Sequence, residues 1–270
     1  YPSYYDVYVE DSGLVIEDTA DEEQFPVWVD SFEQPSEYSG VDILWVIDPS
    51  GSMHDDAPNI LAGIDAMMNA LPATGWRLAI IPSDYRFAEN VIEFPLIPGD
   101  TPEMAETMYN NVMTGAFEAG FDATYGYIMN NSYAQTWMRP DAALLVVFVS
   151  DEDDQSDMYP TALDFSLWYE GLRDGAYLAT INHLDPATSL CNLRTVDIGH
   201  RYMEAANYFN GQIIDICDED WSAGVVDAAS RLEPHEYIQL TYEPIEESIR
   251  VFINGALNYD WYYSATDNTI

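Results

Sequence analysis

An acid and two hydroxyls follow directly after an apolar run in this chain of 270 residues. The run covers residues 41–47, and Asp48, Ser50 and Ser52 come next at a spacing of two. Because the run shows little polar alternation, it predicts a strand that is buried on both faces of a parallel sheet. The carboxyl ends of such strands form the ligand site in open α/β sheets, and a tight loop there can turn all three side chains toward one point. One anionic and two neutral oxygens suit a hard cation such as Mg²⁺ or Ca²⁺.

This Asp-x-Ser-x-Ser motif resembles the metal-ion-dependent adhesion site of von Willebrand factor type A (vWA) domains. Those domains also supply a threonine from a second loop and an aspartate from the end of a later strand. Here Thr114 opens an amphipathic stretch, and Asp151 follows the apolar run 142–149. The resemblance covers about residues 41–232. It implies that the two serines ligate Mg²⁺, Ca²⁺ or Mn²⁺ directly, and that Asp48, Thr114 and Asp151 complete the shell directly or through water.

The resemblance also implies a function in adhesion. A cation held by few carboxylates stays under-neutralised and keeps an open position for an acidic group on a protein or glycan partner. The segments 148–156 and 216–218 resemble a branch of secreted or surface-anchored bacterial vWA proteins. Two alternatives stay open: Asp48 and Asp151 could cap neighbouring helices while the serines form a turn, or the motif could have lost its metal.

More acids crowd the same predicted edge of the sheet: Glu152, Asp153, Asp154 and Asp157. They are interpreted either as accessory ligands, for a second cation or a preference for Ca²⁺, or as a solvated loop. Glu118 lies one turn past Thr114 and could reach the site or face solvent from a helix. The four histidines are scattered, so no zinc site is predicted. Without a Gly-x-Ser-x-Gly elbow or an evident general base, the sequence does not predict an enzyme.

The charge balance is extreme, with 8 basic and 48 acidic residues and a net charge of −40. All the basic residues are arginines. Such a surface excludes nucleic acid and anionic membranes as partners, because phosphate binding needs a basic footprint. It attracts cations, and it is explained either by adaptation to a saline medium that screens the repulsion or by many weak calcium sites.

Cys191 and Cys217 are the two cysteines of the chain. A disulfide between them would stabilise the fold by roughly 3 kcal/mol, and two buried thiols are the alternative. The likeness to the bacterial branch implies the disulfide, and with it a secreted, cell-surface, periplasmic or virion-surface location. The longest apolar run is too short to cross a bilayer, so no direct membrane insertion is expected. Because the chain begins at Tyr1 rather than Met, an export signal is either removed or outside this segment.

The elements that position these residues follow from the periodicity of the apolar side chains. Helical spacing predicts helices at 58–71, from 101, 114–128, from 161, 199–208 and 221–232. Apolar runs predict further strands at 76–81, 91–97 (an edge strand), 142–150, 176–181 and 212–216. The alternation of strands and helices predicts an α/β fold, a doubly wound and mostly parallel sheet flanked by helices.

Segments with a different pattern flank the predicted domain 41–232. Residues 1–40 hold eleven acids and no base among many aromatics, which predicts a lead-in that packs on the domain or on a neighbouring subunit, with an extended piece at 27–32. Residues 233–270 alternate at 237–242 and 249–253 around the hairpin signal Asn254-Gly255, which predicts a small β appendage and leaves room for a continuation of the chain. These flanks favour a second hypothesis, a structural subunit of an extracellular assembly, filament or virion in which the metal only stabilises the fold.

Overall fold

The chain forms two compact units, which we describe separately. The computed structural model describes residues 3–9, 28–34, 38–73, 75–190, 197–232, 238–253, 255–259 and 261–270. Residues 38–232 form one unit, here called the α/β unit. Residues 1–37 and 233–270 together form the other, here called the flanking unit. The two segments that were predicted as a lead-in and an appendage therefore share one sheet.

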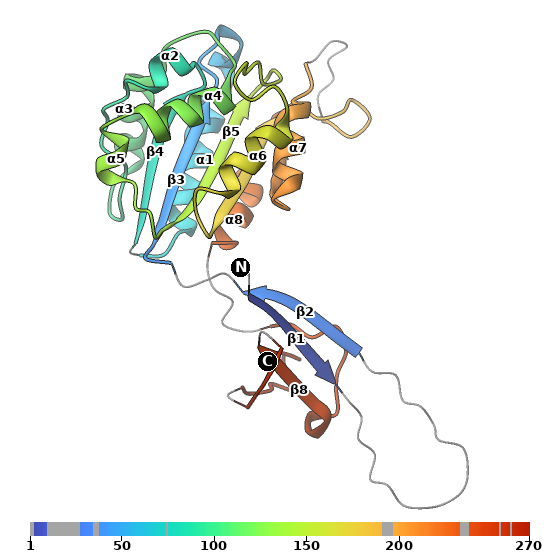
Figure 1. Ribbon diagram of the computed structural model, residues 1–270. Helices are drawn as coiled ribbons and strands as arrows, with labels where there is room; N and C mark the ends of the chain where they lie inside the picture. The colour runs from blue at the N-terminus through green and yellow to red at the C-terminus, as the bar shows by residue number, and fades with distance from the viewer. Residues whose placement is uncertain are drawn as a thin grey trace, which may run out of the picture. The chain divides into compact units, whose positions relative to one another are not determined.

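Five parallel strands form the sheet of the α/β unit, in the order β4-β3-β5-β6-β7. Figure 1 labels the neighbouring strands β4, β3 and β5 of this sheet. Their bounds are β3 Val41–Ile47, β4 Trp76–Pro82, β5 Ala143–Ser150, β6 Ala176–Asn182 and β7 Gln212–Asp215. Every residue of β3 and β5 is buried, as their apolar sequences predict. The predicted α/β fold with a parallel central sheet is confirmed.

Helices flank this sheet and supply the remaining core. The longer ones are α1 Ala57–Ala70, α3 Pro102–Val112, α6 Ala162–Glu170, α7 His200–Tyr208 and α8 Ser222–Ser230. The shorter ones are η1 Gly51–Asp56, α2 Tyr85–Ala88, α4 Gly120–Tyr125, η2 Gly126–Asn130 and α5 Ala134–Trp137. In Figure 1, α4 and α6 pass in front of the sheet, whereas α1 and α8 pack against each other behind it.

The structure corrects two of the predicted elements. The edge strand at 91–97 is reduced to one antiparallel bridge between Leu78 and Leu96, because Pro95 and Pro98 lack the N–H that a ladder requires. The helix predicted at 114–128 begins at Gly120, and residues 113–119 form a loop before it. This second difference moves the predicted site residue Thr114 away from a helix start.

The flanking unit is built on an antiparallel sheet with the strand order β2-β1-β8-β9. The strands are β1 Ser3–Val9, β2 Trp28–Gln34, β8 Ile249–Ile253 and β9 Ala256–Asn258, and a short helix, η3 Glu246–Ser248, precedes β8. The predicted hairpin near Gly255 is confirmed, and this glycine has a positive φ of 76°. The predicted strand at 237–242 is limited, among its described residues, to a bridge between Gln239 and Thr269. A small core fills this unit, made of Leu240, Ile249, Val251 and Tyr263.

Among the described residues, no helix has both the length and the apolar character that crossing a membrane requires.

Candidate metal centre

The candidate site lies where the strand order of the sheet reverses. From β3 the chain continues to β4 on one side, and then crosses to β5 on the other side. Asp48 follows β3 and Asp151 follows β5, so both stand at the carboxyl ends of these two adjacent parallel strands. Open α/β sheets bind their ligands at such a switch point, because the connections diverge there and leave a crevice.

Four of the five predicted metal ligands come together at this point. The hydroxyl oxygens of Ser50 and Ser52 lie 2.9 Å apart, and the Ser52 hydroxyl donates a hydrogen bond of 3.2 Å to Asp151 Oδ1. Asp48 is 1% exposed, and its Oδ1 accepts the Ser50 N–H at 2.7 Å. Two hydroxyls and two carboxylates therefore converge, and this donor set fits a hard divalent cation. That these residues bind a metal remains a prediction.

The fifth predicted ligand, Thr114, is exposed in the loop 113–119. Asp84 holds this loop away from helical geometry, because its Oδ2 accepts the N–H groups of Ala116 at 3.2 Å and Phe117 at 3.4 Å. Gly115 permits the close approach: its φ is +125°, and a Cβ there would lie 2.6 Å from the Asp84 side chain. The described residues show no hydrogen bond between Thr114 and the four converging residues.

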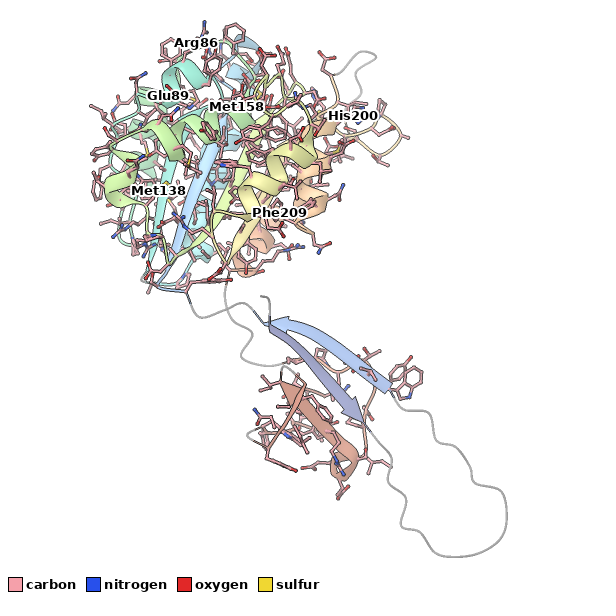
Figure 2. The ribbon with its side chains drawn as sticks, in the orientation of Figure 1. Arg86, Glu89, Met138, Met158, His200 and Phe209 are labelled. Atoms are coloured by element: carbon pink, nitrogen blue, oxygen red, sulfur yellow. The ribbon has the colours of Figure 1, made fainter. Side chains whose placement is uncertain are left out.

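Asp84 is itself fixed by an arginine. Arg86, labelled in Figure 2, donates its Nε–H to Asp84 Oδ1 at 2.8 Å. Burial raises the pKa of Asp84, but the hydrogen bonds from Arg86 and Ala116 outweigh this effect and leave the pKa below its usual value. The loop is thus anchored by an ionised acid that has its own counter-charge.

Glu118, from the same loop, is buried and does not face solvent from a helix, so that part of the prediction is wrong. It is 7% exposed, and its Oε2 accepts a hydrogen bond of 2.9 Å from Gln155 Nε2. Burial raises the pKa of Glu118 to about 7, and the nearby charges of Asp48, Glu152 and Asp151 raise it further. Glu118 therefore belongs to the electrostatic surroundings of the site.

The acids after Asp151 divide into two kinds. Glu152 lies beside the site. The Gln155 amide donates to its Oε2 at 3.2 Å, and burial together with the charges of Asp151 and Asp48 raises the pKa of Glu152. Asp153 and Asp154 instead hold the start of α7. Asp153 Oδ1 accepts the Arg201 N–H at 2.8 Å, and Asp154 forms a 3.0 Å ion pair with the Arg201 guanidinium.

A second cation site has no support in this region. Asp157 is exposed, and Asp154 also accepts the Phe121 N–H at 3.1 Å. Over the part of the chain that the structure describes, no three His, Cys, Asp or Glu side chains are grouped to hold a metal by themselves. A cation here would need the serine hydroxyls as well as carboxylates as ligands.

Sequence reasoning missed three residues beside the site. The Ser150 hydroxyl donates to Asp48 Oδ2 at 2.8 Å, and His183 Nδ1 lies 2.8 Å from the Asp151 carbonyl oxygen. The third residue is Asp56. Burial and the charge of Asp151 raise the pKa of Asp56, and His183 lowers it. Ser150 ends β5 and His183 follows β6, so the rule that ligands gather at the carboxyl ends of parallel strands could have found both.

Five acids are buried among the described residues, and they differ in their counter-charges. Three form ion pairs with arginine: Asp42 with Arg139, Asp84 with Arg86 and Asp154 with Arg201. Asp48 and Glu118 form no ion pair with any described arginine. Burial raises the pKa of Asp48, and the charge of Asp151 adds to this effect. A buried carboxylate without a counter-charge is costly, so these two acids mark the place where a cation would stabilise the fold.

The predicted Cys191–Cys217 disulfide cannot be located, because Cys191 lies outside the described residues. Cys217 follows β7 and packs, partly buried, against the core of the α/β unit. Its N–H donates to Asp215 Oδ1 at 3.1 Å. The disulfide stays a prediction.

No protein-family model and no curated protein sequence matches this chain. Among solved structures, it is similar to proximal thread matrix protein 1 from the mussel byssus with a zinc-occupied MIDAS motif, at 11% identity and a TM-score of 0.47, over 73% of this chain and 48% of that one. It is also similar to the manganese-loaded TRAP protein of Plasmodium vivax, at 15% identity and a TM-score of 0.43, over 73% and 75%. A third is the pilus adhesin SpaC of Lactobacillus rhamnosus GG, at 12% identity and a TM-score of 0.43, over 85% and 31%.

The chain spans about half the length of the byssus protein. Similarity at this level concerns the fold alone. The strand order and the motif at the switch point are observed in this chain itself. The parallel α/β fold of this unit is shown, and its membership of the vWA family stays a prediction from the sequence motif.

Proposed function

We propose that the α/β unit binds one divalent cation between Asp48, Ser50, Ser52 and Asp151, and uses it to hold a protein or glycan partner. The observation that supports this most strongly is Asp48, which is 1% exposed and forms no ion pair with any described arginine. Its partners are the Ser50 N–H and the Ser150 hydroxyl, which cannot neutralise its charge. A cation at the neighbouring hydroxyls would do so.

The donor set suggests how such a cation would act. Serine hydroxyls are neutral ligands, so a cation held by them and by two aspartates keeps part of its charge and coordination free. An oxygen from a partner would fill that position. Mg²⁺, Mn²⁺ and Ca²⁺ all accept such ligands. The proposed setting is secreted or cell-surface and saline, in keeping with a net charge of −40, and the proposed role is binding rather than catalysis.

The test is a calorimetric titration with Mg²⁺, Mn²⁺ and Ca²⁺ at high salt, which suppresses diffuse cation binding to the acidic surface. The wild type is compared with the double variant Ser52→Ala, Asp151→Ala. We expect one saturable site in the wild type and none in the variant. Identical curves would contradict the proposal, and a bound metal would justify screening acidic peptides and glycans as partners.

A second candidate function, a structural subunit, is favoured by the exposed aromatics of the flanking unit. Trp28 is 47% exposed and stacks on Tyr242 with ring centroids 4.0 Å apart, and Tyr259 and Tyr262 are 81% and 79% exposed. Aromatic side chains are enriched at protein interfaces. If this function holds, sedimentation of the full chain should show association that Tyr259→Ser with Tyr262→Ser removes. A wild type that stays monomeric at all concentrations would reject it.

A further inference from the structure

We propose that Glu118, rather than Thr114, is the residue that the loop 113–119 contributes to the cation site, and that it acts as a carboxylate beyond the direct ligands, through water. The inference rests on the proposed function, since it names a further residue for the same cation. It changes the charge of the site, because the loop then supplies an anion where a neutral hydroxyl was expected.

The position of Glu118 is fixed by the ends of two strands. Ser83, which follows β4, donates its hydroxyl to the Phe117 carbonyl at 2.9 Å, and its own carbonyl accepts the Ala119 N–H at 3.3 Å. Gln155, in the loop after β5, donates its backbone N–H to the Glu118 carbonyl at 2.6 Å. The loop is therefore clamped on either side of Glu118, at the edge of the sheet that carries Asp48 and Asp151.

Thr114 precedes, in sequence, the two residues whose N–H groups Asp84 accepts, whereas Glu118 follows them. The turn at Gly115, with its φ of +125°, separates Thr114 from the clamped residues, and the Thr114 side chain is exposed. In contrast, Glu118 is 7% exposed. Burial favours Glu118 as the residue of this loop that faces the site.

The Gln155 amide donates hydrogen bonds to two carboxylates that repel each other. Its Nε2 lies 2.9 Å from Glu118 Oε2 and 3.2 Å from Glu152 Oε2. Asp48 and Asp151 add their charges to those of Glu118 and Glu152, and no described arginine forms an ion pair with any of these four acids. A neutral amide can orient these groups but cannot offset their repulsion, whereas a divalent cation can.

Outer-shell groups of this kind hold their place by hydrogen bonding and act on a metal through water or through a ligand. No three acidic or histidine side chains among the described residues are close enough to form a metal cage. Direct ligation would then fall to the serines and the aspartates, and Glu118 would strengthen the site by its charge.

The experiment measures the binding of Mn²⁺ alone to the full chain at high salt, by calorimetry. Glu118→Gln keeps the volume and removes the charge, and Thr114→Ala is the matched control on the same loop. We expect Glu118→Gln to raise the Kd for Mn²⁺ by about tenfold or more, which is the usual effect of removing an outer-shell group. The Kd of Thr114→Ala for Mn²⁺ should stay within about twofold of the wild-type Kd, a change much smaller than the loss of an outer-shell group causes. If Thr114→Ala weakens binding and Glu118→Gln does not, the inference is wrong.

Two further variants separate the inference from the proposed function. Ser52→Ala tests the site itself: a wild type without a saturable site rejects the proposed function. If the wild type binds, Ser52→Ala does not, and Glu118→Gln binds like the wild type, the inference about Glu118 alone is rejected. Should Glu118→Gln fail to fold, Gln155→Met decides, since loss of the orienting amide should weaken Mn²⁺ binding and an unchanged Kd overturns the inference.

Discussion

Asp42 and Asp48 stand at the two ends of the same strand and are both buried, yet they are stabilised differently. Asp42 is 0% exposed and accepts hydrogen bonds from the backbone N–H, Nε and Nη2 of Arg139, at 2.6, 2.9 and 2.7 Å. Asp48 has hydroxyl and N–H partners and no arginine among the described residues. The chain has 8 arginines for 48 acids, so a buried acid without an arginine is informative. Arg139 supplies the counter-charge at one end of β3, and a cation from solution is our proposal for the other end.

The largest expected effect comes from breaking the ion pair at the Asp42 end of β3. Arg139→Met should lower the free energy of unfolding by about 3–5 kcal/mol, because the buried Asp42 then loses its ion pair. Urea denaturation of the metal-free protein measures this change. Added Mg²⁺ should not restore the loss, since the affected carboxylate is not at the cation site. A loss below about 1 kcal/mol, the value of an exposed pair, would show that the ion pair adds little.

The next largest effect is the contribution of Asp154 to the pH dependence of the unfolding free energy. Burial raises its pKa to about 6, although Arg201 acts against this. Because the pKa is raised in the folded state, the folded protein binds this proton more tightly than the unfolded chain does. The contribution of Asp154 to stability is therefore greatest below about pH 4 and is lost as the pH rises to about 6, on the order of 2–3 kcal/mol.

Asp154→Asn isolates this contribution, because the other carboxylates are common to both proteins. The difference in unfolding free energy between the wild type and the variant should fall across that pH window and stay constant above it. Chemical denaturation at half-unit steps of pH measures the difference. Parallel curves from pH 4 to 7 would contradict the raised pKa.

A smaller effect of opposite sign is expected at the Asp48 end of β3. In the metal-free protein, Asp48→Asn removes a buried charge that has no ion pair, and should raise stability by about 1 kcal/mol. Its matched control is Asp42→Asn, which leaves the partly exposed Arg139 without its carboxylate and should lower stability. Saturating Mg²⁺ should raise the Tm of the wild type but not that of Asp48→Asn. If both variants changed stability in the same direction, the distinction between the two ends of β3 would be lost.

The smallest effect is expected at an exposed pair. Arg231 and Asp227 lie one turn apart at 3.1 Å, and their side chains are 40% and 49% exposed. Solvent screens this pair, so Asp227→Asn should change the free energy of unfolding by less than about 0.5 kcal/mol. Urea denaturation of Asp227→Asn and Arg139→Met under the same conditions compares the two changes in unfolding free energy. An effect as large as that of Arg139→Met would mean that burial does not govern these ion pairs.

Much of the α/β unit could be predicted because its signals are local. The apolar sequence of β3 and β5 and the acid after each strand placed Asp48 and Asp151 on the same edge of the sheet, and the structure has them there. The position of Glu118 could not be predicted in this way. Helical spacing continues from Thr114 through Phe117 to Phe121, but Asp84 holds two backbone N–H groups of this segment from a distant part of the chain.

The roles of the acids after β5 could not be predicted from the sequence either. Glu152, Asp153 and Asp154 are adjacent and chemically alike, and only Arg201, which is 47 residues from Asp154, separates their roles. In the flanking unit, β1 pairs with β8 across most of the chain, and neither strand carries a local sign of the other. Partners that are distant in sequence decide these positions, and a single sequence does not reveal them.

The pairing of β1 with β8 has a mechanical consequence. Tyr5 pairs with Ile253 and Val9 with Ile249, so the N-terminal end of β1 and the C-terminal end of β8 lie at the same end of this ladder. Tension that pulls these two ends apart opens the ladder one residue pair at a time. The α/β unit, inserted in the chain between β2 and β8, would bear none of that load while the ladder holds. Under this pull the β1–β8 ladder would carry the load first, and the α/β unit would be loaded only after the ladder has opened.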